Sequence, residues 1–392
     1  MTTPLWVTLV QTFAVFGYFL IFTAMLIWAE RRIVGRMQSR IGPNRIGPGG
    51  VGQTLIDGLK MFFKEDFTPA MVKNPVFTMA PIIAVVAGFL TIAVIPISGP
   101  VTMFGETFTL VVADLHVGVL WILALSSLHV YGVFLAGWSS NSPYPLLGGV
   151  RASAQMISYE IAQGLAVASV FVYAGTFRVS EIIAQQSGVG PINGVPGWFV
   201  LPLFPAFIVF VVGMVAEAGR PPFDMAEAEG ELVGGFHTEY SGIRFGMFML
   251  AEFMSVVVMS AIVVTLFLGG PAGPTFGLPD SVAWLLSFVW FSLKTAGFVF
   301  FFILLRGALP RTRYHRLMDL GWKVLIPIAL VWVMITAAWV LVNEGGGIPG
   351  TVRVWLAVIA GVLLVGVFFT GGGDDHDADE DAPTTPDTTK VP

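Results

Sequence analysis

Apolar runs recur along most of this 392-residue sequence, and they constrain its fold more than any other feature. A helix that crosses a lipid bilayer needs about 20 apolar residues. Nine runs meet this requirement: 5–29, 76–97, 113–138, 152–176, 198–217, 245–269, 282–305, 322–342 and 352–370. Only 11% of the residues are charged, against roughly 25% in an ordinary soluble domain. The sequence therefore predicts an all-α polytopic membrane protein, and excludes a water-soluble globule.

Positive charges are distributed unevenly between the segments that connect these runs. Counted with the first two residues of the following run, the loops after the first, third, fifth and seventh runs contain sixteen Lys and Arg residues, whereas the other loops contain only Arg178 and Arg353. Because Lys and Arg accumulate on the cytoplasmic side of a membrane, we expect an external N-terminus and a cytoplasmic C-terminus. The first run ends in charged residues without a small-residue cleavage site, so we expect a permanent helix and not a signal peptide. The expected location is the cell (inner) membrane.

The C-terminal segment differs in composition from the rest of the chain. Residues 371–392 are rich in Gly, Asp, Pro and Thr, and seven of the 25 acidic residues lie between Asp374 and Asp387. Such a segment cannot bury a core, so we predict a disordered acidic tail. Residues 1–370 are predicted to form a single transmembrane domain. Since the acidic tail accounts for the net charge of −5, that charge says little about binding. We expect no nucleic-acid partner.

The chain contains no cysteine, which excludes disulfides, thiolate-bound zinc and cysteine-ligated iron–sulfur clusters. Its five histidines are scattered, and we predict no metal site. A redox cofactor would have to be mobile or held by another chain. We expect His129, in the third run, and His116, near its outer end, to be satisfied by neighbouring hydroxyl and carbonyl groups instead of acting in a proton relay.

The first long loop contains a segment with helical periodicity, residues 51–66. Its apolar face comprises Val51, Leu55, Leu59 and Phe62. Its polar face comprises Gln53, Asp57, Lys60 and Lys64. This pattern predicts an amphipathic helix that lies in the membrane interface without crossing it. The helix could simply pack on the domain, or it could frame an opening through which a lipid-soluble substrate enters.

Carboxylates are concentrated after the fifth run and within several of the others. The loop 216–242 contains Glu217, Asp224, Glu227, Glu229, Glu231 and Glu239. Four ionisable residues lie at membrane depth: Glu160, Glu217, Glu252 and Lys294. Each charge at the bilayer centre costs about 2.5–3.5 kcal/mol on insertion scales, so such residues are often functional. A solvated acidic loop and buried ion pairs that fix helix register are one interpretation, and a proton path is the other.

Five long motifs, in order, carry a resemblance to a known family. They are ERRIVGRMQSRIGPNRIGPGG (30–50), QTLIDGLKMFFKED (53–66), GWSSNSPYPLLGGVRASAQMISYE (137–160), RPPFDMAEAEGELVGGFHTEYSG (220–242) and KTAGFVFFFILLRGALPRTRYHRLMDLGWK (294–323). Together they resemble the H subunit of respiratory complex I, the proton-pumping NADH:quinone oxidoreductase. All five lie on the predicted inner face. The last run and the tail, beyond about residue 345, lie outside this resemblance.

The resemblance implies a function and a set of site residues. Loops 30–75, 138–151, 217–244 and 306–322 would form much of the quinone chamber. The quinone path would include Gln38, Arg40, Leu59, Phe62, Arg220, Phe223 and Asp224. The proton relay would comprise Glu160, Glu217, Glu227, Glu229, Glu231 and Glu252.

The resemblance also implies what the chain works with. Ubiquinone or menaquinone would be the substrate, and FMN and iron–sulfur clusters would reside on partner subunits. Those partners would be the hydrophilic quinone-module chains and the adjacent membrane-arm subunits, with lipid around the chain.

Some positions depart from the family pattern, and two other functions remain open. The departures are Ala218-Gly219, Pro143 and Pro145 around Tyr144, and His315-Arg316, and none of them removes a carboxylate of the expected relay. The chain could instead be the membrane subunit of a related hydrogenase or formate-oxidising complex. A stand-alone cation/proton antiporter is a third possibility, although the Arg-, Gly- and Pro-rich segment 36–50 has no core of its own and favours docking onto a partner.

Overall fold

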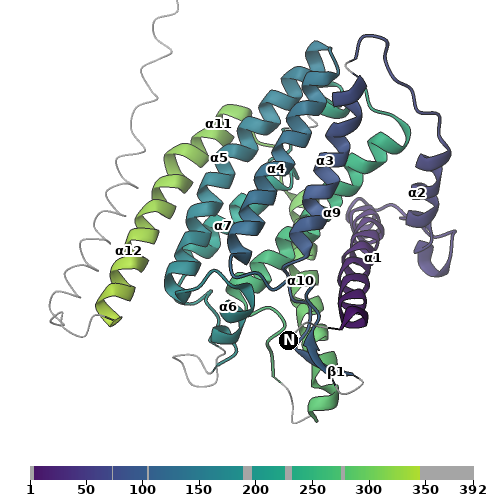
Figure 1. Cartoon of the computed structure of the whole chain (residues 1–392). Helices are drawn as coiled ribbons and strands as arrows, with labels where there is room; N and C mark the ends of the chain where they lie inside the picture. The colour runs from purple at the N-terminus through teal and green to yellow at the C-terminus, as the bar shows by residue number, and fades with distance from the viewer. Residues whose placement is uncertain are drawn as a thin grey trace, which may run out of the picture.

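The computed structural model describes residues 4–72, 74–103, 106–188, 197–225, 232–274 and 279–344. Within these ranges the chain forms a bundle of long helices (Figure 1). Seven helical segments within these described ranges are long and apolar enough to cross a membrane. They comprise Leu5–Met37 (α1), Asn74–Ile92 (α3), Gly118–Ser139 (α4), Pro143–Ala174 (α5), Gly242–Phe267 (α9), Asp280–Ala308 (α10) and the continuous run of Tyr314–Asp319 (α11), a π-helical turn and Ile326–Glu344 (α12). The all-α polytopic membrane fold is confirmed, and the ninth predicted run, 352–370, lies outside the described residues.

The helix in the fifth predicted run is shorter than the run itself. Helix α7 spans Phe204–Glu217, which at 1.5 Å per residue is about 21 Å and less than the hydrocarbon thickness of a bilayer. Residues 198–203, which the apolar pattern included in the span, form turns before Pro205 in the first helical turn. Its last residue, Glu217, is only 6% exposed. Helix α7 therefore ends inside the bundle and places a carboxylate there.

Two other helices extend beyond their predicted runs. Helix α5 begins at Pro143, where a proline in the first turn costs no hydrogen bond, so most of the predicted loop 138–151 is helical. Helix α1 continues past residue 29 to Met37. Its buried stripe runs through Phe19, Thr23 and Leu26 to Glu30. Glu30 is consequently a bundle-facing helical residue and not a loop residue.

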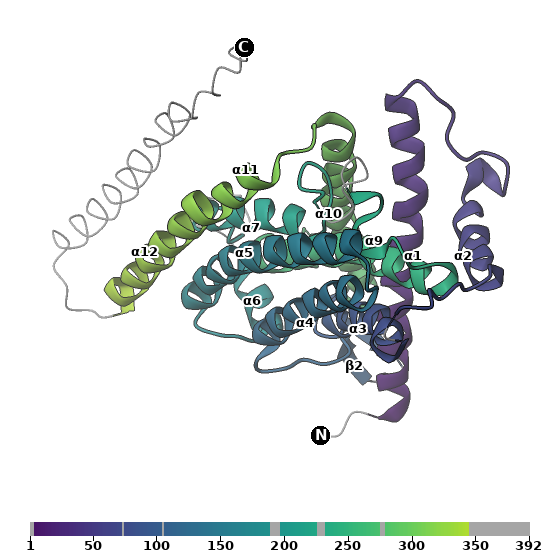
Figure 2. The ribbon, with the colours of Figure 1, turned by 90° about the horizontal axis from the view of Figure 1, so that it is seen from above.

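The predicted amphipathic helix is present as α2, Gln53–Phe63, and it stands beside α1 at the edge of the bundle (Figure 2). Its Met61 packs so closely on Gly246 of α9 that a Cβ atom at that glycine would lie 3.3 Å from the Met61 Cβ. The apolar residues Leu55 and Phe62 are each 70% exposed. The apolar face of α2 is thus left uncovered by the described part of the chain.

An ion pair ties the polar face of α2 to α1. Asp57 accepts a hydrogen bond from Arg31 of α1 and another, of 2.8 Å, from Gln53. Partial burial acts to raise the pKa of Asp57, but these hydrogen bonds and the nearby charges of Arg31 and Lys60 outweigh it and hold the pKa below its ordinary value. Asp57 therefore stays ionised and keeps the helix attached near neutral pH.

Helix α9 lies at the centre of the bundle and is held at both ends. At its C-terminal end the Lys294 ammonium donates to the carbonyls of Leu268 and Ala272, at 2.7 Å each, and of Gly270, at 3.1 Å. A cation is favourable at this end of a helix. At the other end Arg244 donates to Thr68. Lys294, which the sequence marked as an isolated charge at membrane depth, is therefore a cap for α9.

A small hairpin and a short helix were not predicted, and both lie at the end of the bundle that carries the N-terminus (Figure 1). Strands β1 (Pro100–Met103) and β2 (Glu106–Thr109) pair antiparallel, with Pro100 opposite Thr109. Helix α6 spans Val179–Gln186. Each is only four to eight residues long, which is too short for its periodicity to stand out between apolar runs.

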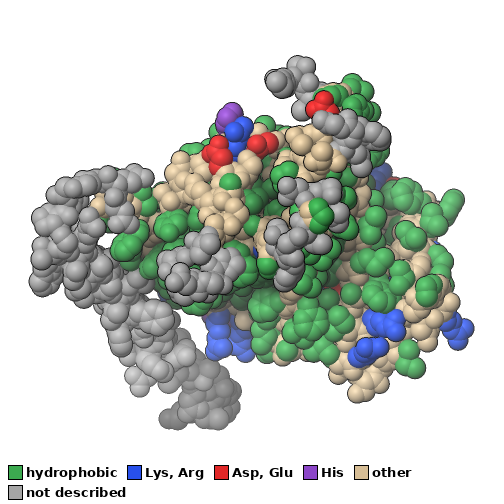
Figure 3. Space-filling view, turned by 90° about the horizontal axis from the view of Figure 1, so that it is seen from below, with side chains coloured by type: hydrophobic (Ala, Val, Ile, Leu, Met, Phe, Trp, Pro, Cys, Tyr) green, Lys and Arg blue, Asp and Glu red, His purple; other side chains and the backbone are tan. Residues whose placement is uncertain are grey.

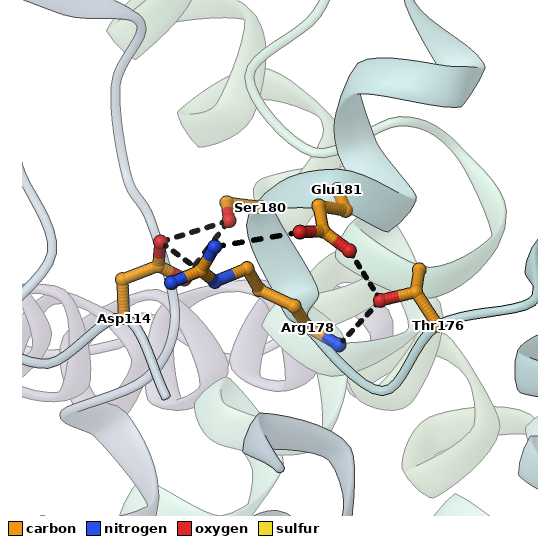
Figure 4. A network of polar contacts seen from close by, with 5 residues as sticks. All are labelled: Asp114, Thr176, Arg178, Ser180 and Glu181. Atoms are coloured by element: carbon orange, nitrogen blue, oxygen red, sulfur yellow. Dashed lines mark hydrogen bonds and ion pairs between the residues drawn. The ribbon is translucent and has the colours of Figure 1, made fainter. Parts of the chain in front are cut away.

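A polar cluster secures α6 to the segment that precedes α4. Figure 3 shows a small group of charged and histidine side chains at this end of the molecule, and Figure 4 shows Arg178 between Asp114 and Glu181. The guanidinium lies 3.3 Å from Asp114 and 3.4 Å from Glu181, and Ser180 donates a 2.9 Å hydrogen bond to Asp114. A hydrogen bond from Thr176, with help from Arg178, holds the pKa of Glu181 below its ordinary value.

The predicted orientation can be tested directly, because the chain contains no cysteine. We expect the variant S187C, after α6, to react with a membrane-impermeant thiol reagent in intact cells. The variant K64C, at the end of α2, should react only in inverted membrane vesicles. The parent chain is the labelling control, and the opposite pattern of reactivity would show that the bundle is inserted the other way round.

Candidate functional site

Four charged side chains from distant segments meet inside the bundle. The Arg220 Nε atom lies 3.1 Å from a carboxylate oxygen of Glu252, and its Nη1 lies 3.7 Å from Glu30. Arg306 of α10 forms an ion pair with the same Glu30 oxygen. The Arg220 guanidinium also stacks over the Phe253 ring, 4.2 Å from its centroid. Because two cations face two anions, the cluster carries no net charge, which limits the cost of burying it.

The chain after α7 folds so that Arg220 points into the bundle. Gly219 has a φ of +62°, the left-handed conformation that ends many helices and that glycine adopts without strain. The buried amide of Gln155 then donates to the carbonyls of Ala216 and Phe223, at 2.7 Å each. These two bonds close the turn from both sides, so that Arg220 is only 6% exposed.

Two cavities adjoin this charge cluster. The larger has a volume of about 250 Å³ and is lined by Arg220, Gly234, His237, Phe245, Met249, Glu252, Phe253 and Arg306. The smaller has a volume of about 30 Å³ and is lined by His129, Val133, Met156, Glu217, Ala218, Gly219, Phe236, Phe248, Ala251, Glu252 and Ser255. The smaller one has room for a water molecule. Glu252 borders both, so it lies between a charged cavity and a mostly apolar one.

Two further carboxylates continue from the smaller cavity. Glu217 lines it, and the Glu217 Oε2 atom is buried with no hydrogen-bond partner among the described residues. Glu160 of α5 accepts hydrogen bonds from the hydroxyls of Ser126, at 3.1 Å, and Ser127 of α4. Glu160 lies close enough to Glu217 for the two carboxyl groups to interact electrostatically. Glu252, Glu217 and Glu160 therefore follow one another from the charge cluster into the bundle, as a proton path requires.

The structure separates the predicted quinone-path residues into two groups. Arg220 and Phe223 are buried beside the cluster, and the Phe223 ring lies 5.8 Å from Tyr159. Asp224 follows them in the same turn, partly exposed. Four residues lie on the surface instead: Gln38 and Arg40, which hydrogen-bond each other at the end of α1, and Leu59 and Phe62 on α2. The predicted relay residues Glu227, Glu229 and Glu231 lie outside the described residues.

Sequence reasoning missed Glu30 and Arg306, which complete the charge cluster. Both were counted as residues at the ends of apolar runs. A signal for Glu30 was present, since it continues the helical spacing of Phe19, Thr23 and Leu26 on the buried side of α1. Arg306 offered no comparable signal, because arginine near the end of a span usually reaches the interface.

Comparison with known proteins decides the family. A family model described as NADH dehydrogenase matches residues 10–337. The chain belongs to the NADH dehydrogenase family. It is 48% identical over 374 residues to the H subunit of the NADH-quinone oxidoreductase of Frankia casuarinae, which covers 95% of this chain and 81% of that protein. The corresponding protein of Cutibacterium acnes, which carries the same name, is 45% identical over 394 residues, covering 98% of this chain and 89% of its own length.

Family membership confirms the resemblance that the five sequence motifs carry. The matched region includes every described residue of the charge cluster and both cavities. It also spans the helices long enough to cross a membrane, apart from the last residues of α12 and the first of α1. In this family member, the buried charges therefore belong to the shared part of the chain.

The shared carboxylate of the cluster gives a stability prediction. In the variant E30Q, Arg220 and Arg306 lose their common anion and leave only Glu252 to compensate them. Breaking a buried pair costs about 3–5 kcal/mol, and we expect the lower end because Arg306 is 40% exposed. The measurement is the temperature of half-inactivation of the assembled complex.

Two further variants provide the comparison. E65Q removes an exposed carboxylate in the same part of the chain and should leave the half-inactivation temperature unchanged. The double variant E30Q/R306M should recover part of the loss, because it removes the uncompensated cation as well. An E30Q complex as stable as the parent would mean that the cluster does not stabilise the fold.

Proposed function

We propose that this chain is the membrane subunit of an NADH-quinone oxidoreductase that helps to form the quinone chamber and couples quinone reduction to proton translocation. Its relatives at 45–48% identity are named as subunits of that enzyme. The observation that carries the proposal is the position of Glu252, which borders both the charged cavity and the cavity of Glu217. In this proposal, quinone reduction occurs in the first cavity, next to a residue that also borders the second.

The larger cavity offers the groups that a quinone head requires. A quinone head is a flat ring with carbonyl oxygens, which accept hydrogen bonds and gain negative charge on reduction. Arg220 and Arg306 supply donors and positive charge, while Phe245, Met249 and Phe253 supply apolar walls. The surface residues Gln38 and Arg40, with Asp224, belong to the part of the chamber that a partner chain completes.

The amphipathic helix α2 provides the route from the lipid. Met61 of α2 packs on Gly246, and the adjacent Phe245 lines the larger cavity. The exposed side chains of Leu59 and Phe62 present an apolar surface beside this point. A substrate with a long apolar tail can follow such a surface from the bilayer without losing contact with hydrocarbon. This arrangement favours an entrance over an ordinary packed helix.

Coupling follows from the change in charge that reduction causes. Conversion of a quinone to a quinol takes up two protons, and a charged intermediate near Arg220 competes with its ion pair to Glu252. Release of Glu252 changes the charge beside the smaller cavity, and the protonation of Glu217 and Glu160 responds. Glu227, Glu229 and Glu231 belong to the same proposed relay. The carboxylates thus convert a chemical change into a shift in protonation along the membrane.

Electrons reach the quinone from partner subunits in this proposal. FMN and iron–sulfur clusters on those subunits would supply them, and this chain has no cysteine with which to ligate a cluster. The segment 36–50 docks the hydrophilic quinone-module chains, and other faces of the bundle meet the adjacent membrane-arm subunits. The complex resides in the cell membrane, with ubiquinone or menaquinone as substrate.

The relay can be tested with E217Q, which removes the titratable group and keeps its shape. We expect quinone reductase activity and proton pumping to fall by on the order of tenfold or more, since a positioned proton-transfer group contributes at least that much. NADH oxidation by a hydrophilic artificial acceptor should be unchanged, because it bypasses the quinone. The matched control is E106Q in the exposed strand β2, and parent-like pumping by assembled E217Q would contradict the relay.

The entrance can be tested with F62E, which places a charge on the apolar face of α2. We expect a several-fold higher apparent KM for a long-tailed quinone and little change in kcat, because the charge hinders entry and leaves the chamber intact. The variant F62L keeps the face apolar and should behave as the parent. Equal KM values for F62E and F62L would make α2 a structural element only.

A further inference from the structure

We propose that His129 is an additional proton-relay residue, which exchanges a proton with Glu217 across the smaller cavity. This inference rests on the proposed function, because it adds a member to the carboxylate relay. Sequence reasoning gave His129 only a local hydrogen bond. That bond exists, but it accounts for one ring nitrogen, and the side chain also lines the cavity that Glu217 and Glu252 share.

The hydrogen bond fixes which nitrogen can take up a proton. His129 Nδ1 lies 3.3 Å from the carbonyl oxygen of Ala84 in α3. A carbonyl oxygen only accepts hydrogen bonds, so Nδ1 carries the hydrogen and the lone pair of the neutral ring is on Nε2. The same bond holds the ring in place. His129 is thus a neutral base with an oriented acceptor.

The cavity provides the route between the two side chains. It brings together His129 of α4, Glu217 at the end of α7, and Glu252 and Ser255 of α9. Val133, Met156 and Phe248 form apolar walls around them. A volume of about 30 Å³ holds a water molecule, which can pass a proton between groups that do not touch.

One carboxylate oxygen of Glu217 is open to such a partner. Its side chain is more than nine-tenths buried, and its Oε2 atom has no hydrogen-bond partner within the part of the chain that the structure describes. Loss of its proton to bulk water would leave an unbalanced charge in an apolar site, which is costly. Transfer to His129 breaks the O–H bond of Glu217 and forms an N–H bond at Nε2. The product is a carboxylate facing an imidazolium, so the cavity gains no net charge.

The charged groups around the ring come from three helices. Helix α7 contributes Glu217 and α9 contributes Glu252, which is paired with Arg220 on its far side. Helix α5 contributes Glu160, held by two hydroxyls of α4 one turn before His129. Helix α3 contains no ionisable residue and supplies only the Ala84 carbonyl. Among the described residues that line the cavity, the ionisable groups besides His129 are therefore the two carboxylates of Glu217 and Glu252.

The test compares H129N with H116N in membranes that contain the assembled complex. Asparagine can still donate a hydrogen bond to the Ala84 carbonyl, but it has no basic nitrogen in place of the histidine Nε2 atom and cannot take up a proton. We expect H129N to lower quinone reductase activity and pumping by on the order of tenfold, with a changed pH profile across the neutral range. Oxidation of NADH by a hydrophilic acceptor should be unchanged, and H116N, at an exposed position, should behave as the parent.

The outcomes separate this inference from the proposed function. If E217Q is inactive and H129N is normal, the carboxylate relay stands and His129 has no part in it. Normal activity in both variants would overturn the relay as a whole. If H129N lowers the rate by the same factor at every pH, the histidine has a structural role and the inference is wrong. Only a loss with an altered pH profile supports proton exchange at His129.

Discussion

The balance of charge at Arg220 is the interaction on which the rest of the structure depends. An isolated guanidinium could not remain inside a lipid-embedded bundle, and the carboxylates of Glu30 and Glu252 make its burial possible, while Arg306 balances the second of these negative charges. These four residues come from α1, the turn after α7, α9 and α10. Packing of helices that are far apart in sequence is therefore coupled to one electrostatic condition. The same condition explains why a polar cavity exists at this point of a largely apolar core.

Hydrophobic length predicted the fold well, because lipid leaves a chain few alternatives to helices. Helix ends were predicted less well, since hydropathy registers where apolar residues stop and not where hydrogen bonding stops. Helix α5 continues through Pro143, and α1 continues through Glu30, although both segments contain charge or proline. Helix α7 is shorter than its apolar run because residues 198–203 fold into turns. Lys294 could not be understood at all until its carbonyl partners were in view.

The candidate site was predicted by residue type and completed by geometry. Buried Glu and Arg residues stand out in an apolar sequence, so Arg220, Glu217 and Glu252 were identifiable. Their partners were not, because a charge at the end of a span is compatible with both solvent and a neighbouring helix. His129 shows another limit of the sequence. Its expected contact with a neighbouring carbonyl is present, at Ala84, while the cavity that it also lines became visible only when four helices were assembled.

The capping of α9 has a mechanical consequence. Lys294 donates hydrogen bonds to three carbonyls at the C-terminal end of α9. At the other end, Arg244 donates to Thr68 in the segment after α2 and forms an ion pair with Asp66 at 3.2 Å. A helix anchored at both ends resists sliding and rotation. Glu252 lies between these two anchors. A change in the charge of its carboxylate therefore cannot be accommodated by a rigid-body shift of the helix. In the proposed relay, such a change would be accommodated by side-chain rotation and proton transfer, while α9 itself stays in place.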